Sequence, residues 1–240
     1  MTNKRSRQFS EMKVGFIRLA ILLETLFSCF ISHASTTLMT GDYNSIKEVL
    51  KFAQADSSLV RQARMIAKEY VAKDSIQTLK EGMCCVSIFK MNDDTTSALS
   101  VINNMHSRNL QPDTFLYNNV ISVCSKVSDW RLAIDILLLM QNRGVASDTI
   151  SFSSAISACA KAGRWRESLN LLNEMTIAGV PADTICYSSA ISACAGAGCW
   201  KESLLLLSDM KAKKVHIDTI VYNSAISSCS PSGEWTVALR

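Results

Sequence analysis

The residues best equipped for chemistry recur at one interval along this chain. Four aspartates lie 35 residues apart, and each is followed by threonine. A carboxylate only accepts hydrogen bonds, so such an aspartate could cap a helix or accept an N–H from a ligand. Cysteine, tryptophan and methionine keep the same spacing. The four series are Asp113, Asp148, Asp183 and Asp218; Cys124, Cys159, Cys194 and Cys229; Trp130, Trp165, Trp200 and Trp235; and Met105, Met140, Met175 and Met210.

The nine cysteines predict neither a zinc site nor a disulfide framework. No CxxC pair occurs, and the three histidines (His33, His106 and His216) are far apart in the sequence. The recurrent cysteines share one face of a predicted helix. We therefore interpret them as small buried hydrophobic residues that stay reduced.

No residue pattern typical of an enzyme is present in the sequence. There is no HxE with a later CxxC, which a zinc deaminase needs, and no clustered aspartates for a metal nuclease. The GAG at 196–198 lacks the Lys-Ser/Thr of a phosphate-binding loop. We expect no catalysis, no cofactor, no metal ion and no small-molecule substrate.

Composition favours an all-helical protein. Apolar residues make up 48% of the chain, against only 9 glycines and 3 prolines. The formal net charge of +4 is already supplied within the first 18 residues, so the remainder is close to neutral. A global basic field is thus absent, and any attraction for phosphate must come from local side chains.

The amino terminus has the order of a targeting peptide, with a basic start, an apolar stretch and then small residues. Arg18 and Glu24 interrupt the apolar stretch, and each charge costs about 2.5 to 3.5 kcal/mol near a bilayer centre. We therefore expect no membrane span and interpret residues 1–35 as a targeting presequence. An amphipathic first helix and an arbitrary gene start are the alternatives.

The 35-residue period divides the chain into units that each predict two helices. Apolar residues recur at i, i+3, i+4 and i+7 in both halves of a unit, and a glycine follows each helix in several units. One hairpin cannot bury its apolar stripe alone, so successive units must stack into an α-solenoid. The predicted segments are 36–78, a degenerate helical region; 79–113, a degenerate repeat; 114–148, 149–183 and 184–218, full repeats; and 219–240, an incomplete repeat.

The predicted stripes define the core. The first helix contributes Tyr117, Val120, Ile121 and Cys124 and their equivalents, and the second contributes residues in phase with the tryptophans. We interpret the tryptophans as core residues rather than base-stacking platforms. The second-helix stripes are Trp165, Leu169, Leu172 and Met175, then Trp200, Leu204, Leu207 and Met210.

The segment DTISFSSAISACAKAGRWRESLNLLNEMTIAGVPAD resembles the pentatricopeptide repeat family in length, in its aromatic-plus-small start, in AxxxCxKAGRW and in LLxEMxxxGVxxD. The resemblance covers residues 98–240. It implies a right-handed superhelix of helix-turn-helix repeats and a protein of the mitochondrion or plastid. It also implies single-stranded RNA as the partner, bound along the first-helix surface with one base for each unit.

In the family, the fifth and last residues of a unit contact the base edge, and the second residue packs against base faces. Asp suits a base with an N–H on its pairing edge, uracil or guanine, and Ser leaves more room for a purine than Asn does. The resemblance therefore implies a U-G-G core read 5′ to 3′ from the amino-terminal unit. The implied fifth and last residues are Asn118 with Asp148, Ser153 with Asp183, Ser188 with Asp218, and Asn223; the second residues are Phe115, Ile150, Ile185 and Ile220.

Two lysines complete the predicted RNA-binding residues. Lys126 and Lys161 lie at the end of the first helix, where each could contact phosphate oxygens or the helix C-terminus. Gly196 and Pro231 replace them later in the chain. Two alternatives to direct RNA recognition stay open. One is a scaffold for protein partners in RNA processing, which the near-neutral repeats favour, and the other is a recruiter of a separate enzyme.

Overall fold

The computed structural model of the chain describes residues 57–72, 76, 78–231 and 233. The predicted presequence, 1–35, and most of the region 36–78 lie outside these residues. All elements in the described part are α-helices, and none of them is long and apolar enough to cross a membrane. They are α3 (Ser57–Ala72), α4 (Leu79–Met91), α5 (Thr95–Ser107), α6 (Thr114–Val127), α7 (Trp130–Asn142), α8 (Thr149–Lys161), α9 (Trp165–Ile177), α10 (Thr184–Ala197), α11 (Trp200–Ala212) and α12 (Thr219–Cys229).

Each recurrent aspartate begins the first helix of a unit. The side chain of Asp148 accepts a hydrogen bond from the Ser151 backbone N–H at 2.8 Å, which satisfies one of the unpaired donors at the start of α8. Asp113, Asp183 and Asp218 cap α6, α10 and α12 in the same way. The capping role predicted for these aspartates is therefore confirmed.

The helices end at residues with positive φ that also recur every 35 positions. Gly163 (φ 70°) and Gly198 (φ 70°) follow first helices, as their sequence predicted. The equivalent residue after α6 is Ser128, with φ 62°, so a non-glycine residue adopts the same left-handed conformation there. Gly144 and Gly179 follow second helices, and Lys214 replaces them after α11.

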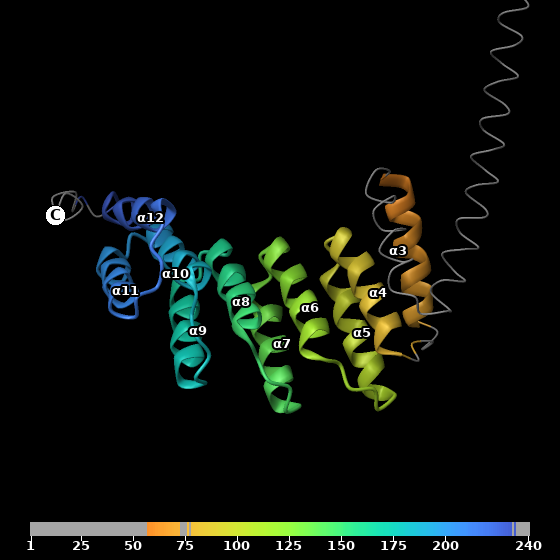
Figure 1. The fold of residues 1–240 in the computed structure, drawn as a ribbon. Coiled ribbons are helices and arrows are strands. Elements are labelled where there is room, and N and C mark those ends of the chain that lie inside the picture. The colour runs from red at the N-terminus through yellow and green to blue at the C-terminus, as the bar shows by residue number, and fades with distance from the viewer. Residues whose placement is uncertain (1–56, 73–75, 77, 232, 234–240) are drawn as a thin grey trace, which may run out of the picture. The chain divides into compact units, whose positions relative to one another are not determined.

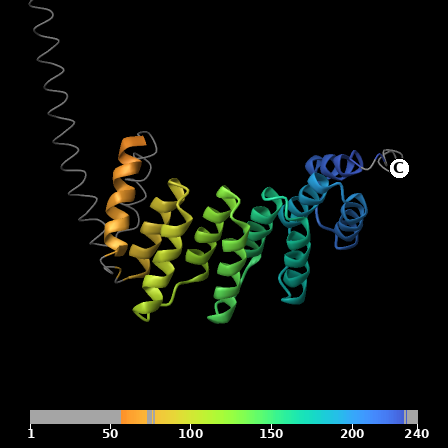
Figure 2. The same ribbon diagram turned by 180° about the vertical axis from the view of Figure 1, so that it is seen from behind.

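The first helices pack directly on one another in the order α4, α6, α8, α10 and α12 (Figure 1). Each second helix packs between the first helix of its own unit and that of the next, and no two second helices of the described units pack directly against each other. Figure 2 shows the same succession from behind. The described helices thus form the all-α solenoid that the period predicted.

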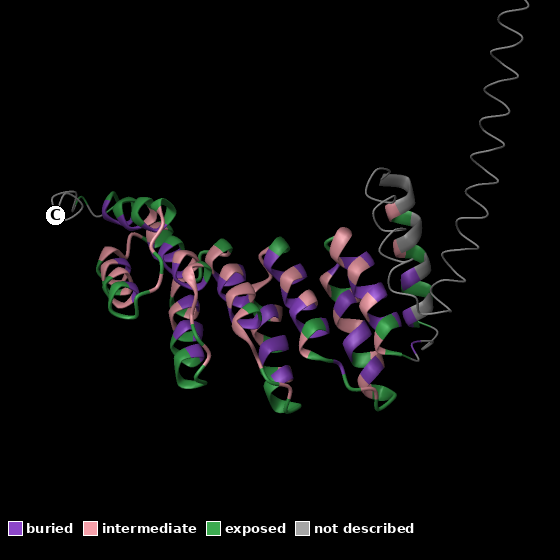
Figure 3. Ribbon diagram, in the orientation of Figure 1, coloured by how far each residue is buried: buried purple, intermediate pink, exposed green. Residues whose placement is uncertain are grey.

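The core lies where adjacent hairpins meet (Figure 3). Tyr117, Phe152 and Tyr187 occupy equivalent positions of three units and are each 0% exposed. Burying a side chain of this size contributes about 1.5 to 3 kcal/mol. The recurrent threonines connect the start of each unit to its final loop. The Thr149 hydroxyl donates a hydrogen bond to the Pro181 carbonyl at 3.0 Å, and Thr114 and Thr184 make equivalent bonds.

The core role predicted for the tryptophans is wrong for the three that the structure describes, and Trp235 lies outside the described residues. Trp130, Trp165 and Trp200 are only half-buried, because each is the first residue of a second helix and lies at the edge of the stack. Cations cover their exposed faces instead. The Arg164 guanidinium lies 4.9 Å from the centre of the Trp130 ring.

The second-helix stripe is consequently shifted from its predicted phase. Leu172 and Met175 are buried as predicted, whereas Leu169 is half-buried and Ser168 and Leu171 replace it in the core. In α11 only Met210 of the predicted stripe is buried, and Leu204 and Leu207 are half-buried.

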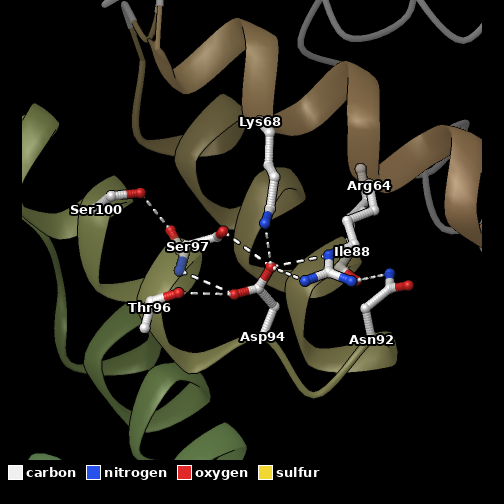
Figure 4. Close-up of polar contacts among 8 residues, drawn as sticks. All are labelled: Arg64, Lys68, Ile88, Asn92, Asp94, Thr96, Ser97 and Ser100. Carbon is white, nitrogen blue, oxygen red and sulfur yellow. Dashed lines mark hydrogen bonds and ion pairs between the residues drawn. The ribbon is translucent and has the colours of Figure 1, made fainter.

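Asp94 attaches α3 to the first hairpin (Figure 4). It caps α5 by accepting from Ser97, and its carboxylate also contacts Arg64 at 2.7 Å and Lys68 at 2.9 Å on α3. Burial works to raise the pKa of Asp94, but the hydrogen bonds from Lys68, Ser97 and Arg64 outweigh it and hold the pKa below its ordinary range.

Candidate nucleic-acid interface

Four large apolar side chains lie exposed at the same position of successive first helices. Each is the second residue of its unit, in the first turn of α6, α8, α10 or α12. Large apolar residues that recur at one position of a repeat are normally buried. Their regular exposure here indicates an interaction surface. The residues and their exposed fractions are Phe115 50%, Ile150 59%, Ile185 59% and Ile220 65%.

The fifth and last residues of the first full unit contact each other. Asn118 Nδ2 donates to the two carboxylate oxygens of Asp148, at 3.0 and 3.2 Å. Asn118 is 7% exposed, and Asp148 is half-buried at the start of α8. Partial burial works to raise the pKa of Asp148, but hydrogen bonds from Ser151 and Asn118 lower it overall. The aspartate is therefore a charged acceptor at neutral pH.

The corresponding serines of the next two units bond within their own helices. Ser153 donates to the Ile150 carbonyl at 3.2 Å, and Ser188 donates to the Ile185 carbonyl at 3.1 Å. Both serines are half-buried, as are Asp183 and Asp218. Serine is smaller than Asn118, and neither serine bonds to the aspartate at the end of its unit. The second and third units therefore leave more room beside Asp183 and Asp218.

The fourth predicted position lies in a groove. Asn223 is exposed on α12 and lines a hollow of about 490 Å³ together with Ile220 and residues of α10, including Gly196. The groove brings a predicted base-contacting residue and a predicted packing residue side by side.

The two predicted lysines connect neighbouring first helices. Lys126 at the end of α6 donates to the Lys90 carbonyl of α4 at 3.0 Å and pairs with Asp93 at 3.4 Å. Lys161 at the end of α8 donates to the Ser125 carbonyl of α6 at 2.9 Å. Both side chains neutralise the negative end of the preceding helix. An ammonium has three N–H donors, so each lysine keeps at least one donor for a further acceptor.

Sequence reasoning missed Ser151. This residue is 0% exposed, and its hydroxyl lies within hydrogen-bond distance of Asn118 Oδ1 and Asp148 Oδ1, to either of which it can donate its one proton. Its equivalents are Leu116, Cys186 and Val221, so the 35-residue pattern contains no signal for it. The only indication in the sequence is that a serine occupies a position where the other units have Leu, Cys or Val.

The recurrent cysteines form no disulfide and are buried, as their helix phase predicted. Burial raises the pKa of Cys124 and of Cys159 to about 12, so their thiolates are scarce at neutral pH. Within residues 57–231, apart from the few positions not described, no group of His, Cys, Asp or Glu side chains is arranged to hold a metal ion.

The fold and this surface define a helical-repeat protein, in which hairpins present equivalent side chains along one row of first helices. Residues 112–161 and 148–196 match the PPR repeat family, where PPR denotes the pentatricopeptide repeat, and residues 185–215 match the PPR repeat. The chain therefore contains pentatricopeptide repeats over residues 112–215. No curated protein matches it in sequence.

Solved structures agree with this fold. The pentatricopeptide repeat protein PPR10 from maize is similar over 83% of this chain, with 16% identity and a TM-score of 0.64. Its complex with an 18-nt psaJ RNA element is similar over 90%, with 20% identity and a TM-score of 0.65. This chain spans 31% of the length of PPR10.

A shorter structure is also similar. The PPR domain of Arabidopsis thaliana protein-only RNase P 1, in complex with tRNA, matches 64% of this chain and 83% of its own length, with 14% identity and a TM-score of 0.55. At these identities the likeness concerns the fold.

Proposed function

We propose that this protein binds single-stranded RNA along its first helices, one base for each unit, without catalysing a reaction itself. The row of exposed residues Phe115, Ile150, Ile185 and Ile220 is the principal support. Each adjoins a polar position of its own helix one turn further on. An unstacked base needs both an apolar surface for its face and polar groups for its edge.

The proposed bases follow from the donors and acceptors of each unit. Asn118 with Asp148 accepts uracil, and Ser153 with Asp183 and Ser188 with Asp218 accept guanine, which gives U-G-G from the amino-terminal unit. The aspartate side chains accept the N–H that uracil and guanine present on their pairing edges. Lys126 and Lys161 contact phosphates through the N–H groups that their helix carbonyls leave available.

The first experiment measures fluorescence anisotropy of short labelled RNAs on the full chain. We expect a UGG-containing oligomer to bind more tightly than RNA homopolymers and than DNA of the same sequence. Each base in contact contributes about 1 to 3 kcal/mol, so a footprint of a few units gives modest affinity. Equal binding of all oligomers would contradict base selectivity. Absence of RNA binding would instead favour a surface for peptides or protein partners.

A substitution tests the assignment of bases to units. Ser153→Asn is expected to shift the preference at the second base from guanine toward uracil, because the larger amide takes the room of a purine. The matched control is Ser208→Asn, the same change at an exposed position of the second helix α11. An unchanged preference in the first variant would reject this assignment.

The pentatricopeptide repeats support a proposal for the cellular role. We propose that the protein acts in RNA processing, stability or translation in a mitochondrion or plastid, alone or as a recruiter of a separate enzyme. Imaging of the full chain fused to a fluorescent protein at its carboxyl end tests the location. A uniform cytosolic signal would contradict it.

A further inference from the structure

A buried hydroxyl from the second full unit holds the proposed base-contacting amide of the first. Ser151 belongs to α8, whereas Asn118 belongs to α6, and the hydroxyl of the serine bonds to the Oδ1 atom of Asn118. The same hydroxyl accepts the Asp148 backbone N–H at 3.1 Å and lies 2.9 Å from Asp148 Oδ1. Ser151 thus contacts both base-contacting residues of one unit while being 0% exposed itself.

These bonds fix which way the amide faces. The Asp148 carboxylate only accepts, so the Asn118 nitrogen must point toward it, at 3.0 and 3.2 Å. The carbonyl oxygen of Asn118 then faces the Ser151 hydroxyl, which can donate to it. Ser151 thus adds to Asp148 a second partner that disfavours the flipped amide, in which Oδ1 would face the carboxylate.

The orientation matters for the choice between the two pyrimidines. An amide N–H suits the O4 acceptor of uracil, whereas an amide oxygen suits the N4 amino group of cytosine. An amide of fixed orientation therefore prefers uracil, and a rotating amide accepts both bases.

The other units lack this arrangement. Cys186 and Val221 take the place of Ser151 in the following units, and neither is a strong hydrogen-bond donor. The fifth residues there are Ser153 and Ser188, which bond to carbonyls of their own helices. In the three full repeats, the fifth residue of a unit is asparagine where the third residue of the next unit carries a hydroxyl. It is serine where that third residue is cysteine or valine.

We infer that Ser151 is a positioning residue that contributes to base specificity: together with Asp148 it holds the amide of Asn118 in one orientation, and its hydroxyl strengthens the selection of uracil over cytosine by the first full unit. This inference rests on the proposed RNA binding. It assigns a specificity role to the third residue of the following unit, a residue that touches no base.

The first test removes the hydroxyl. Ser151→Ala is expected to lower the ratio of affinities for UGG and CGG oligomers by about five- to tenfold, the worth of one hydrogen bond. Affinity for UGG and stability against urea are measured on the same protein. A loss that is equal for UGG and CGG would show a purely structural role and overturn the inference.

A second test introduces the same asparagine and hydroxyl pair into the second full unit and leaves Asn118, Asp148 and Ser151 of the first unit unchanged. Ser153→Asn alone and Ser153→Asn with Cys186→Ser are compared for UUG against UCG oligomers. The double variant is expected to prefer uracil at the second base about five- to tenfold more than the single variant does. Equal ratios would overturn the inference while leaving RNA binding intact, whereas failure of every oligomer to bind would overturn the proposed function itself.

Discussion

At the scale of single residues, Asp94 and Asp129 occupy the same position of successive units but have different numbers of partners. Both cap the second helix of their unit, Asp94 on α5 and Asp129 on α7. Only Asp94 also contacts Arg64 and Lys68, because α3 lies beside it. The pair separates the energy of a helix cap from the energy of attachment between elements.

We expect Asp129→Ala to lower the free energy of unfolding by about 0.5 to 2 kcal/mol, the usual cost of a lost cap. Asp94→Ala should lower the free energy of unfolding by about 1 kcal/mol more, because Arg64 and Lys68 on α3 also lose their ion-pair partner. The extra loss is small because both cations are partly exposed, and water screens the ion pairs. Urea denaturation followed by circular dichroism measures both. Equal losses would show that α3 gains nothing from Asp94.

The lowered pKa of Asp94 gives this contribution a pH dependence. A carboxylate whose pKa falls on folding stabilises the protein above its unfolded pKa of about 3.9 and loses that effect as the pH falls through the folded value. The difference in unfolding free energy between the native chain and Asp94→Ala should therefore narrow as the pH is lowered from about 6 to about 3. A difference that stays constant would contradict the shift.

Cysteine reactivity gives another prediction at this scale. Cys124 and Cys159 are buried with a pKa of about 12, whereas Cys199 is partly exposed. Iodoacetamide at about pH 8 should therefore modify Cys199 well before these two, because thiolate at the surface is the reactive species. Mass spectrometry of peptides identifies the site. Early labelling of Cys124 in folded protein would contradict its burial.

The sequence predicted some of these residues and not others for a physical reason. Burial of the cysteines followed from helix periodicity, which is a property of neighbouring residues. The contact of Ser151 with Asn118 joins residues of different hairpins, and only the relative placement of α6 and α8 determines it. The base-contacting roles themselves stay predictions until RNA is bound.

At the scale of elements, the ends of the helices were predicted more accurately than their faces. Aspartate caps and residues of positive φ act locally, so Asp148 and Gly163 already mark the limits of α8 in the sequence. The face of a second helix depends on what covers it. Trp165 has the period of the buried stripe but begins α9, where a side chain lies over the turn before the helix, and it is only half-buried.

The lysine that joins first helices can be transferred to a unit that lacks it. Gly196 occupies the position of Lys161 in α10, and a Cβ atom there would meet nothing within 4 Å. Gly196→Ala should raise the free energy of unfolding by about 0.5 to 1 kcal/mol, because glycine is a poor helix former. Gly196→Lys should add about 0.5 kcal/mol more by reaching the Ala160 carbonyl of α8.

The comparison of these two variants isolates the new contact. Both remove the glycine, and only the lysine can donate to the neighbouring helix. Thermal unfolding measures the two gains. Equal stabilities would indicate that the lysine stays in solvent, and a loss in both would indicate that the helix is distorted at this point.

At the scale of the whole molecule, a repeat pattern predicts a stack because each hairpin buries its apolar face only against its neighbours. The order of the first helices followed from that rule alone. The polar connections between units did not, because Lys161 with Ser125 and Asn118 with Asp148 depend on how far each hairpin turns relative to the last.

The near-neutral stack leads to a last prediction, on the salt dependence of RNA binding. Each neutralised phosphate of a single strand contributes about −0.7 to the slope of log affinity against log salt. If Lys161 contacts a phosphate with the donors that the Ser125 carbonyl leaves available, Lys161→Met should make the slope shallower by about 0.7. Lys201→Met is the control, since Lys201 lies over Trp200 on a second helix and should leave the slope unchanged. Anisotropy titrations of the UGG oligomer at several salt concentrations measure both, and an unchanged slope in the Lys161 variant would limit this lysine to capping α6.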